Sequence, residues 1–156
     1  LPQARVLPIC AQNGTGVERL LQEIVHHIPK GPKYFPSDVL TNRDERFFAT
    51  EIIRETILNS YKDEIPYSCE VKVESYQDKS PSLSVIECSI IVNRNSQKLI
   101  LIGKGGLKLK LVGTAAREKL EKFLERKVFL SLRVKVDTDW RSNKESLKKY
   151  GYYEDD

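Results

Sequence analysis

A proline-rich run divides the sequence and limits how it can fold. The eight residues from Pro29 to Pro36 contain three prolines and one glycine. Proline fixes φ and removes a backbone donor, so such a run excludes regular structure and favours an extended, semi-rigid connector. We therefore assign residues 29–40 to a linker and treat the parts on either side of it separately.

The first part, residues 1–28, is too short to enclose a core. The apolar run over residues 5–11 predicts a strand. Apolar residues at helical spacing from Val17 to Ile28 predict an amphipathic helix. A single strand and a single helix cannot bury a core between them, so we interpret this part as the end of a larger α/β domain.

The second part, residues 41–137, predicts one compact domain. Thr41 and Asn42 are residue types that begin helices, and Pro66 is expected to stop the helix that follows. Alternating and apolar patterns then predict further elements. These are strands at 69–76 and 83–92, helices at 97–102 and 107–125, and a third strand at 128–136. The long helix should be anchored by Leu107, Leu111, Ala115, Leu120, Phe123 and Leu124. Residues 138–156 form a C-terminal segment with a short closing helix and an acidic tail.

The composition excludes several classes of protein. With 40% apolar and 31% charged residues, the chain is neither collagen-like nor disordered. No apolar run approaches the roughly 18–20 residues that cross a bilayer. Three cysteines without a C-x-x-C pair give no disulfide framework and no zinc site, so we expect a reduced, intracellular protein without a metal. The sequence has no methionine, and we expect it to be part of a longer chain.

The charge is concentrated in the second half of the chain. Between Lys98 and Lys149 there are fifteen Lys and Arg against six Asp and Glu, a net charge of +9, although the whole chain carries only +4. Such a basic segment favours a polyanionic partner. The alternative is a solvated helix surface rich in lysine.

A glycine loop, Gly103-Lys104-Gly105-Gly106, lies between two predicted helices. Bare backbone amides at a helix N-terminus favour a phosphate, and Leu99, Ile102 and Leu107 beside the loop could line a narrow groove for bases. Backbone clamping beside such a groove is how KH modules hold single-stranded nucleic acid. The alternative is a helix end and tight turn without a ligand. The candidate RNA-binding residues are Leu99, Ile102, Gly103, Lys104, Gly105, Gly106, Leu107, Lys108 and Lys110.

The residues provide no catalytic site. The string G-x-x-x-x-G-K-[ST], which cradles nucleotide phosphates, does not occur. No Ser/His/Asp or Cys/His pairing emerges, and the paired Asp137 and Asp139 follow the last strand in a turn context. We therefore expect this chain not to be an enzyme.

The element order resembles that of a type II KH domain, and the sequence resembles the C-terminal part of the Era-type GTPases. Residues 41–47, 51–55, 64–68, 102–106 and 134–136 with Trp140 carry this resemblance. It implies an α+β fold, a three-stranded sheet with helices packed on one face, preceded by a strand and helix of a P-loop GTPase domain. Residues 10–16 resemble the family's last guanine-recognition motif, S-A-x-x-G-x-G, with Cys10 in place of Ser. The resemblance assigns Cys10, Ala11 and Gln12 to a guanine-binding remnant.

The resemblance also implies a function. Era-type proteins take part in small ribosomal subunit assembly, and their KH module grips the single-stranded 3′ end of the small-subunit ribosomal RNA. GTP and Mg²⁺ are cofactors of the full-length family proteins, and none is expected for this chain, which we expect to be a monomer. The compartment would be the bacterial cytoplasm, the chloroplast stroma or the mitochondrial matrix, and the polar tail favours an organelle. Two alternatives stay open: a type II KH module of another ribosomal or transcription protein, and a protein-interaction domain whose glycine loop is inert.

Overall fold

The computed structural model describes residues 4–32, 36, 41 and 43–152 of the 156-residue chain. The chain divides into two compact units, Leu1–Asn42 and Arg43–Asp156. Residues 29–32 of the predicted linker carry no helix or strand, whereas residues 33–35 and 37–40 lie outside the described part. The two units are described separately.

The first unit contains the predicted helix but lacks the predicted strand. Helix α1 is Val17–His27. The expectation of a strand over residues 5–11 is wrong, because the β pairing among the described residues of this unit is limited to one isolated bridge between Cys10 and Thr15. A strand needs a neighbouring strand to satisfy its backbone donors and acceptors, and residues 4–32 supply none.

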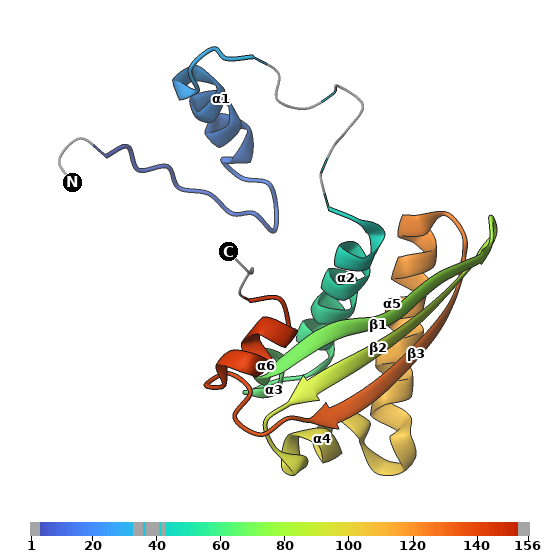
Figure 1. Ribbon diagram of the computed structural model, residues 1–156. Helices are drawn as coiled ribbons and strands as arrows, with labels where there is room; N and C mark the ends of the chain where they lie inside the picture. The colour runs from blue at the N-terminus through green and yellow to red at the C-terminus, as the bar shows by residue number, and fades with distance from the viewer. Residues whose placement is uncertain (1–3, 33–35, 37–40, 42, 153–156) are drawn as a thin grey trace. The chain divides into compact units, whose positions relative to one another are not determined.

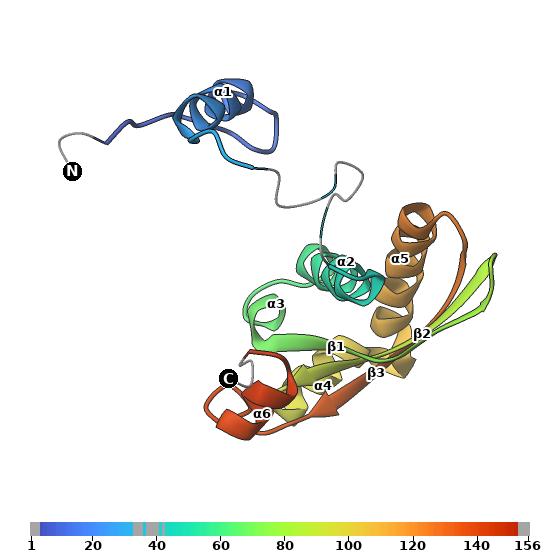
Figure 2. The same cartoon turned by 45° about the horizontal axis from the view of Figure 1, so that its top comes forward.

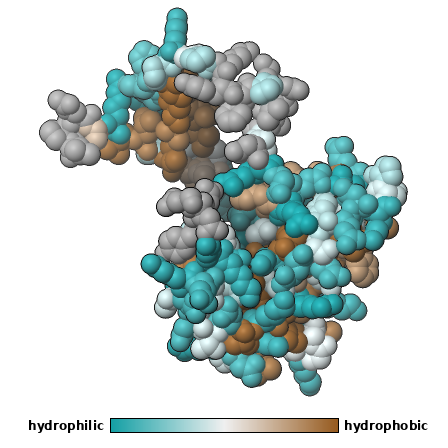
Figure 3. All heavy atoms as spheres, in the orientation of Figure 1, coloured by the Kyte–Doolittle hydropathy of each residue, from teal (hydrophilic) through white to brown (hydrophobic). Residues whose placement is uncertain are grey.

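Helix α1 has an apolar face that stays exposed. Leu21, Ile24, Val25 and the following Ile28 are between 43% and 73% exposed. Figure 3 shows brown spheres gathered over α1 and the extended segment before it. Within its own unit this helix therefore buries no apolar core.

The second unit has the element order that the sequence predicts, with one short helix, Ile65–Ser68, added before the first strand (Figure 1). Its helices are α2 (Glu45–Ser60), α3 (Ile65–Ser68), α4 (Asn95–Ile102), the short 3₁₀ turn η1 (Lys104–Gly106), α5 (Leu107–Leu124) and α6 (Lys144–Lys149). Its strands are β1 (Cys69–Ser80), β2 (Leu83–Val92) and β3 (Lys127–Val136).

The sheet is mixed, in the order β1-β2-β3. Strands β1 and β2 form an antiparallel hairpin, whereas β2 and β3 run parallel. A parallel pair needs a crossover connection, and here the crossover consists of α4, the glycine loop and α5. The glycine loop therefore lies within the connection between two paired strands, between its two helices.

The core lies between the sheet and the helices α2, α4 and α5. Residues one helical turn apart on α2 (Ala49, Ile53, Ile57) and on α5 (Val112, Ala116, Leu120) face alternate residues of β2. Figure 2 shows α2 and α5 on the same side of the sheet. The core residues of the sheet and of α4 include Val71, Ile86, Cys88, Ile90, Val92, Val134 and Leu101.

Three predicted helix details are corrected by the structure. Helix α2 begins after Asp44, whose side chain accepts a hydrogen bond from the Phe47 amide at 2.9 Å, so Thr41 is not its cap, and Asn42 lies outside the described residues. Pro66 starts the short helix α3 instead of ending α2, because proline fits the first turn of a helix, where its missing N–H has no partner to lose. On α5, Leu120 and Leu124 are buried as predicted, and Ala115 is half-buried. The predicted anchors Leu107, Leu111 and Phe123 are exposed, and Val112 and Ala116 are buried instead.

The C-terminal segment covers part of the sheet face that α2 and α5 leave open. Trp140 is buried and packs against Tyr150 and Tyr152, with ring centroids 5.6 and 5.9 Å apart. The Tyr152 hydroxyl donates to the buried carboxylate of Glu70 in β1. Figure 2 shows α6 on the side of the sheet opposite α2. The expected packing of helices on one face is therefore extended by a short cap on the other.

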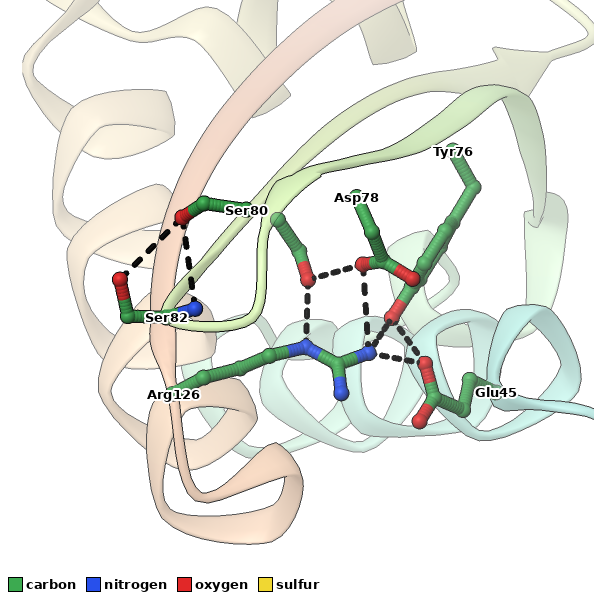
Figure 4. A network of polar contacts seen from close by, with 7 residues as sticks. Glu45, Tyr76, Asp78, Ser80, Ser82 and Arg126 are labelled. Carbon is green, nitrogen blue, oxygen red and sulfur yellow. Dashed lines mark hydrogen bonds and ion pairs between the residues drawn. The ribbon is translucent and has the colours of Figure 1, made fainter.

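Arg126 joins three separate parts of the unit (Figure 4). Its Nε donates to Ser84 Oγ at 2.6 Å, and its Nη2 lies 3.3 Å from Asp78 Oδ1 in the β1–β2 hairpin. The same Nη2 also contacts Tyr76 and the Glu45 carboxylate at the start of α2. This network fixes the hairpin and the N-terminal turn of α2 to the loop before β3.

Candidate nucleic-acid interface

The glycine loop leaves its backbone bare. Gly105 and Gly106 have φ angles of 59° and 79°, and a Cβ atom at either position would meet nothing within 4 Å. Gly103, with φ of 71°, is packed instead, because a Cβ there would lie 2.8 Å from Lys108 Cγ. Positive φ favours glycine at all three positions, and the open side of Gly105 and Gly106 admits a close backbone approach by a ligand.

The predicted lysines surround this loop with uncompensated charge. Lys104, Lys108 and Lys110 are exposed. In the described part of the chain, neither these lysines nor Lys98 makes an ion pair with an acidic side chain. Four cations without acidic partners beside bare amides form a favourable place for phosphate oxygens.

A groove of about 380 Å³ begins at the loop and runs between α5 and β3. Its apolar part is formed by Leu109, Leu130 and Leu132, and Gly113 lies in the wall supplied by α5. The polar part is formed by Lys110, Thr114 and Arg117. Apolar walls with a few polar groups at the rim suit flat, partly polar ligands such as unstacked bases.

Arg117 is held at the rim of this groove by Glu121. The two side chains form an ion pair at 3.0 Å, and Glu121 Oε1 also accepts a hydrogen bond from the Val128 amide at 3.2 Å. The Val128 amide, and then Arg117 and Lys127, lower the pKa of the Glu121 carboxyl. A carboxylate that remains charged keeps the guanidinium oriented along the helix.

The predicted apolar residues lie elsewhere than the groove lining. Ile102 is half-buried and packs against the core. Leu99 and Leu107 are 65% and 62% exposed, and neither lines the groove. Of the predicted residues, Gly106 and Lys110 line the groove itself, and Gly103, Lys104, Gly105 and Lys108 are their near neighbours in the sequence.

Sequence reasoning did not single out six of the residues that line the groove: Leu109, Gly113, Thr114, Arg117, Leu130 and Leu132. One signal was available, because a glycine in a helix interior costs about 1 kcal/mol relative to alanine and indicates a local need for space. The structure shows that need: the nearest side chain to a Cβ built on Gly113 is Leu132, across the groove at 3.7 Å. The two leucines of β3 carried no separate signal, since alternation alone does not tell a groove from a core.

The loop that resembles a guanine-recognition motif is tightly folded. The Cys10 amide donates to the Thr15 carbonyl at 2.9 Å, and Asn13 Oδ1 accepts from the Thr15 amide at 3.0 Å. Gly16 has φ of 74°, and a Cβ there would lie 2.4 Å from the Pro8 carbonyl. Cys10, Ala11 and Gln12 are all exposed along this turn.

Two of the three cysteines, Cys69 and Cys88, are buried, and the described residues form no metal cluster. Burial raises the pKa of Cys69 to about 11 and that of Cys88 to about 12, so neither forms a thiolate at neutral pH. No group of three His, Cys, Asp or Glu side chains converges on a metal position in the described ranges. None of the helices that can be described is long and apolar enough to cross a membrane.

Comparison with known families identifies the second unit. Residues 64–141, half of the chain, match the family model of the KH domain. The chain belongs to the KH domain family. The mixed three-stranded sheet with α4, the glycine loop and α5 in its crossover is the KH fold that the sequence predicted.

The relatives of this KH chain are Era GTPases. It is 46% identical to the GTPase Era of Geotalea uraniireducens over 97% of its own length, and 45% identical to the chloroplastic GTPase ERA-like protein of Arabidopsis thaliana over 94%. These alignments cover 51% and 34% of the two relatives, so the chain spans about half of the first and about a third of the second. The predicted resemblance to the C-terminal region of Era-type GTPases is confirmed.

Solved structures agree with this assignment. An Aquifex aeolicus Era variant bound to GDP·AlF₄⁻ superposes with a TM-score of 0.86 at 39% identity, covering 94% of this chain and 50% of that one. A structure of Era in complex with MgGDPNP and nucleotides 1506–1542 of 16S ribosomal RNA superposes equally well, with the same TM-score and identity.

Proposed function

We propose that this chain is the RNA-binding part of an Era-type GTPase and grips the single-stranded 3′ end of the small-subunit ribosomal RNA during assembly of that subunit. The observation that carries the proposal is the groove between α5 and β3, which ends at the bare backbone of Gly105 and Gly106. Phosphates would lie at the loop, where Lys104 and Lys108 are exposed, and bases would lie between Leu109 and Leu132. The Era structure with 16S ribosomal RNA supports this choice of ligand.

The same proposal assigns the rest of the chain. Residues 1–28 would be the end of a GTPase domain, residues 29–40 a linker, residues 41–137 the KH domain and residues 138–156 a C-terminal extension. The exposed apolar face of α1 supports the first assignment, since it is suited to packing against a larger domain. In a full-length protein carrying that domain, GTP and Mg²⁺ would be the cofactors, and Cys10, Ala11 and Gln12 would lie beside the guanine.

This chain by itself is proposed not to hydrolyse GTP, because its sequence contains no phosphate-cradling G-x-x-x-x-G-K-[ST] string. A purified sample that released phosphate from GTP above a buffer control would contradict this. The bacterial and chloroplastic relatives favour a reducing compartment, either a bacterial cytoplasm or an organelle. We propose a monomer.

The decisive experiment is a titration of a labelled single strand against the parent chain and a Lys104→Asp/Gly105→Asp variant. Two negative charges at the phosphate contact should reduce affinity at least tenfold. The loss should be similar for a strand matching the ribosomal 3′ end and for a scrambled one, because phosphate contacts position a strand without distinguishing its bases. Aspartate tolerates the left-handed conformation of Gly105 better than most residues, so the fold should survive.

A matched control makes the same substitutions away from the groove. Lys62 is exposed, and Gly151 has φ of 84° with nothing within 4 Å of a built Cβ. Lys62→Asp/Gly151→Asp should therefore keep the parent's affinity. If the folded Lys104→Asp/Gly105→Asp variant binds like the parent, the phosphate clamp is wrong and a protein-interaction domain becomes the better assignment.

A further inference from the structure

The sheet face turned away from α2 and α5 carries a small polar pocket of about 200 Å³. Because Ile86, Cys88 and Ile90 of β2 point into the core, the alternate residues of β2 and β3 point to this open face. Glu87 lies opposite Ser131, and Ser89 lies opposite Arg133. The polar lining consists of Glu74, Glu87, Ser89, Ser131, Arg133 and Lys135.

Two of the charged side chains are paired with each other and two are not. Lys135 Nζ donates to Glu74 Oε1 at 2.7 Å, and this hydrogen bond is the main cause of the lowered pKa of Glu74. Within the part of the chain that the structure describes, neither Glu87 nor Arg133 has an ion pair or a side-chain hydrogen bond. An acceptor-only carboxylate and a donor-only guanidinium therefore point to one pocket with their hydrogen-bonding capacity unused.

An exposed aromatic ring lies on the same face. Phe129 is 61% exposed and precedes Ser131 by two residues along β3, which places both side chains on one side of the sheet. Glu87 lies diagonally across from Phe129 on the neighbouring strand. An exposed ring on an open sheet surface is a stacking platform for a nucleic-acid base.

We propose that this open sheet face holds one unpaired RNA base, outside the α5–β3 groove. Phe129 stacks on the base, Glu87 accepts from its exocyclic amino group, and Arg133 contacts a neighbouring phosphate. A carboxylate favours bases with an amino donor: adenine, cytosine or guanine. Sites for drug-sized ligands have volumes of roughly 300–1,000 Å³. The pocket, at about 200 Å³, is smaller and suits a ligand of the size of a single base.

This inference rests on the proposed function, because the same strand must reach both sites. A KH loop clamps about four nucleotides. The RNA in the Era complex spans nucleotides 1506–1542. If the groove of this chain holds about four nucleotides, most of an RNA of that length lies outside the groove. The open sheet face adds a second contact that only a longer strand can use.

The first test compares two RNAs on the 156-residue chain and its Phe129→Ala variant. One RNA has the sequence of nucleotides 1506–1542, and the other is a hexanucleotide from its single-stranded 3′ end, long enough for the groove alone. The variant should bind the long RNA roughly 5- to 150-fold more weakly, the factor expected for one lost base–aromatic stack, and the hexanucleotide unchanged. Phe129→Trp should keep the parent's affinity for both. Tyr67→Ala, which removes a ring that is 71% exposed on α3, is the matched control.

The second test separates base recognition from simple charge attraction. A face that only attracts phosphate should bind the long RNA more tightly after Glu87→Lys. If Glu87 accepts from a base, the same variant should bind that RNA at least several-fold more weakly and the hexanucleotide as before. Circular dichroism verifies the fold, and Phe129→Leu, apolar but without a π face, replaces Phe129→Ala if that variant unfolds.

Several results would overturn the inference while leaving the proposed function intact. These are unchanged binding of the long RNA by Phe129→Ala, an equal loss for both RNAs, tighter binding by Glu87→Lys, or a loss seen only with intact small subunits, which would indicate a protein contact. Failure of the parent chain to bind either RNA would instead contradict the proposed function.

Discussion

Leu132 Cδ1 lies 3.7 Å from the position that a Cβ atom would occupy at Gly113. The distance is an ordinary van der Waals contact, so alanine fits at this position, while any larger side chain extends into the groove between α5 and β3. A single glycine thus keeps space open between a helix and the edge strand of the sheet.

Two substitutions at Gly113 should separate stability from binding. Gly113→Ala should raise the free energy of unfolding by up to about 1 kcal/mol, because alanine is the better helix former. Its affinity for single-stranded RNA should equal that of the parent chain. Gly113→Leu should fold but bind single-stranded RNA at least tenfold more weakly. Urea unfolding measures the stability, and an anisotropy titration measures the RNA affinity. Ala115→Leu is the control, because it places a leucine two positions further along α5, at a residue that does not line the groove. Full RNA affinity in Gly113→Leu would show that the groove is not the base site.

Arg126→Ala should destabilise the second unit by about 1–3 kcal/mol, the range for losing hydrogen bonds that involve a charged group. The guanidinium contacts Ser84, Asp78 and Glu45, and its removal takes one contact from each of them. The hydrogen bonds from Ser84 to Asp78 and from Tyr76 to Glu45 remain. The neighbouring Lys127 is 79% exposed at its side chain, so Lys127→Ala should change stability by less than about 0.5 kcal/mol. Equal unfolding midpoints in urea for both variants would show that the network contributes nothing measurable.

Binding of single-stranded RNA should weaken steeply with salt. If Lys98, Lys104, Lys108 and Lys110 each neutralise one phosphate, the slope of log affinity against log salt should be about −0.7 per contact, or roughly −3 in total. Each Lys→Gln substitution should reduce the slope by one contact. A slope near zero in titrations from low to moderate salt would mean that these lysines are only solvated.

Thiol reactivity should distinguish Cys10 from the other two cysteines. Cys10 is exposed, whereas burial disfavours the thiolates of Cys69 and Cys88 and raises their pKa values to about 11 and about 12. At pH 8 a thiol-specific chromophoric reagent should modify one cysteine of the native chain and all three in denaturant. Rapid modification of more than one thiol in the native chain would indicate that the core opens.

The sequence predicted the second unit well because its periodicities are strong. The alternation from Cys69 and the apolar run from Leu83 place β1 and β2, and the bounds predicted for the second strand are those found. The glycine loop was located because positive φ at Gly105 and Gly106 favours a residue without a side chain.

The groove could not be predicted in the same way. Its walls combine Leu109 of α5 with Leu130 and Leu132 of β3, and only the three-dimensional crossover brings these together. Leu107 and Leu111 have the apolarity of core residues but lie exposed. The strand predicted over residues 5–11 failed because pairing depends on a neighbour that the described first unit does not supply.

The crossover between β2 and β3 also has a kinetic consequence. The β1–β2 hairpin closes through a two-residue turn, whereas β3 must return across 34 residues of chain to pair with β2. Closing a long connection is slower than closing a short one, so we expect β3 to dock after the hairpin has formed. Pulsed hydrogen exchange during refolding should then protect β1 amides before those of β3. Since α5 and β3 are the two walls of the groove, the capacity to hold RNA is acquired only in the final step of folding.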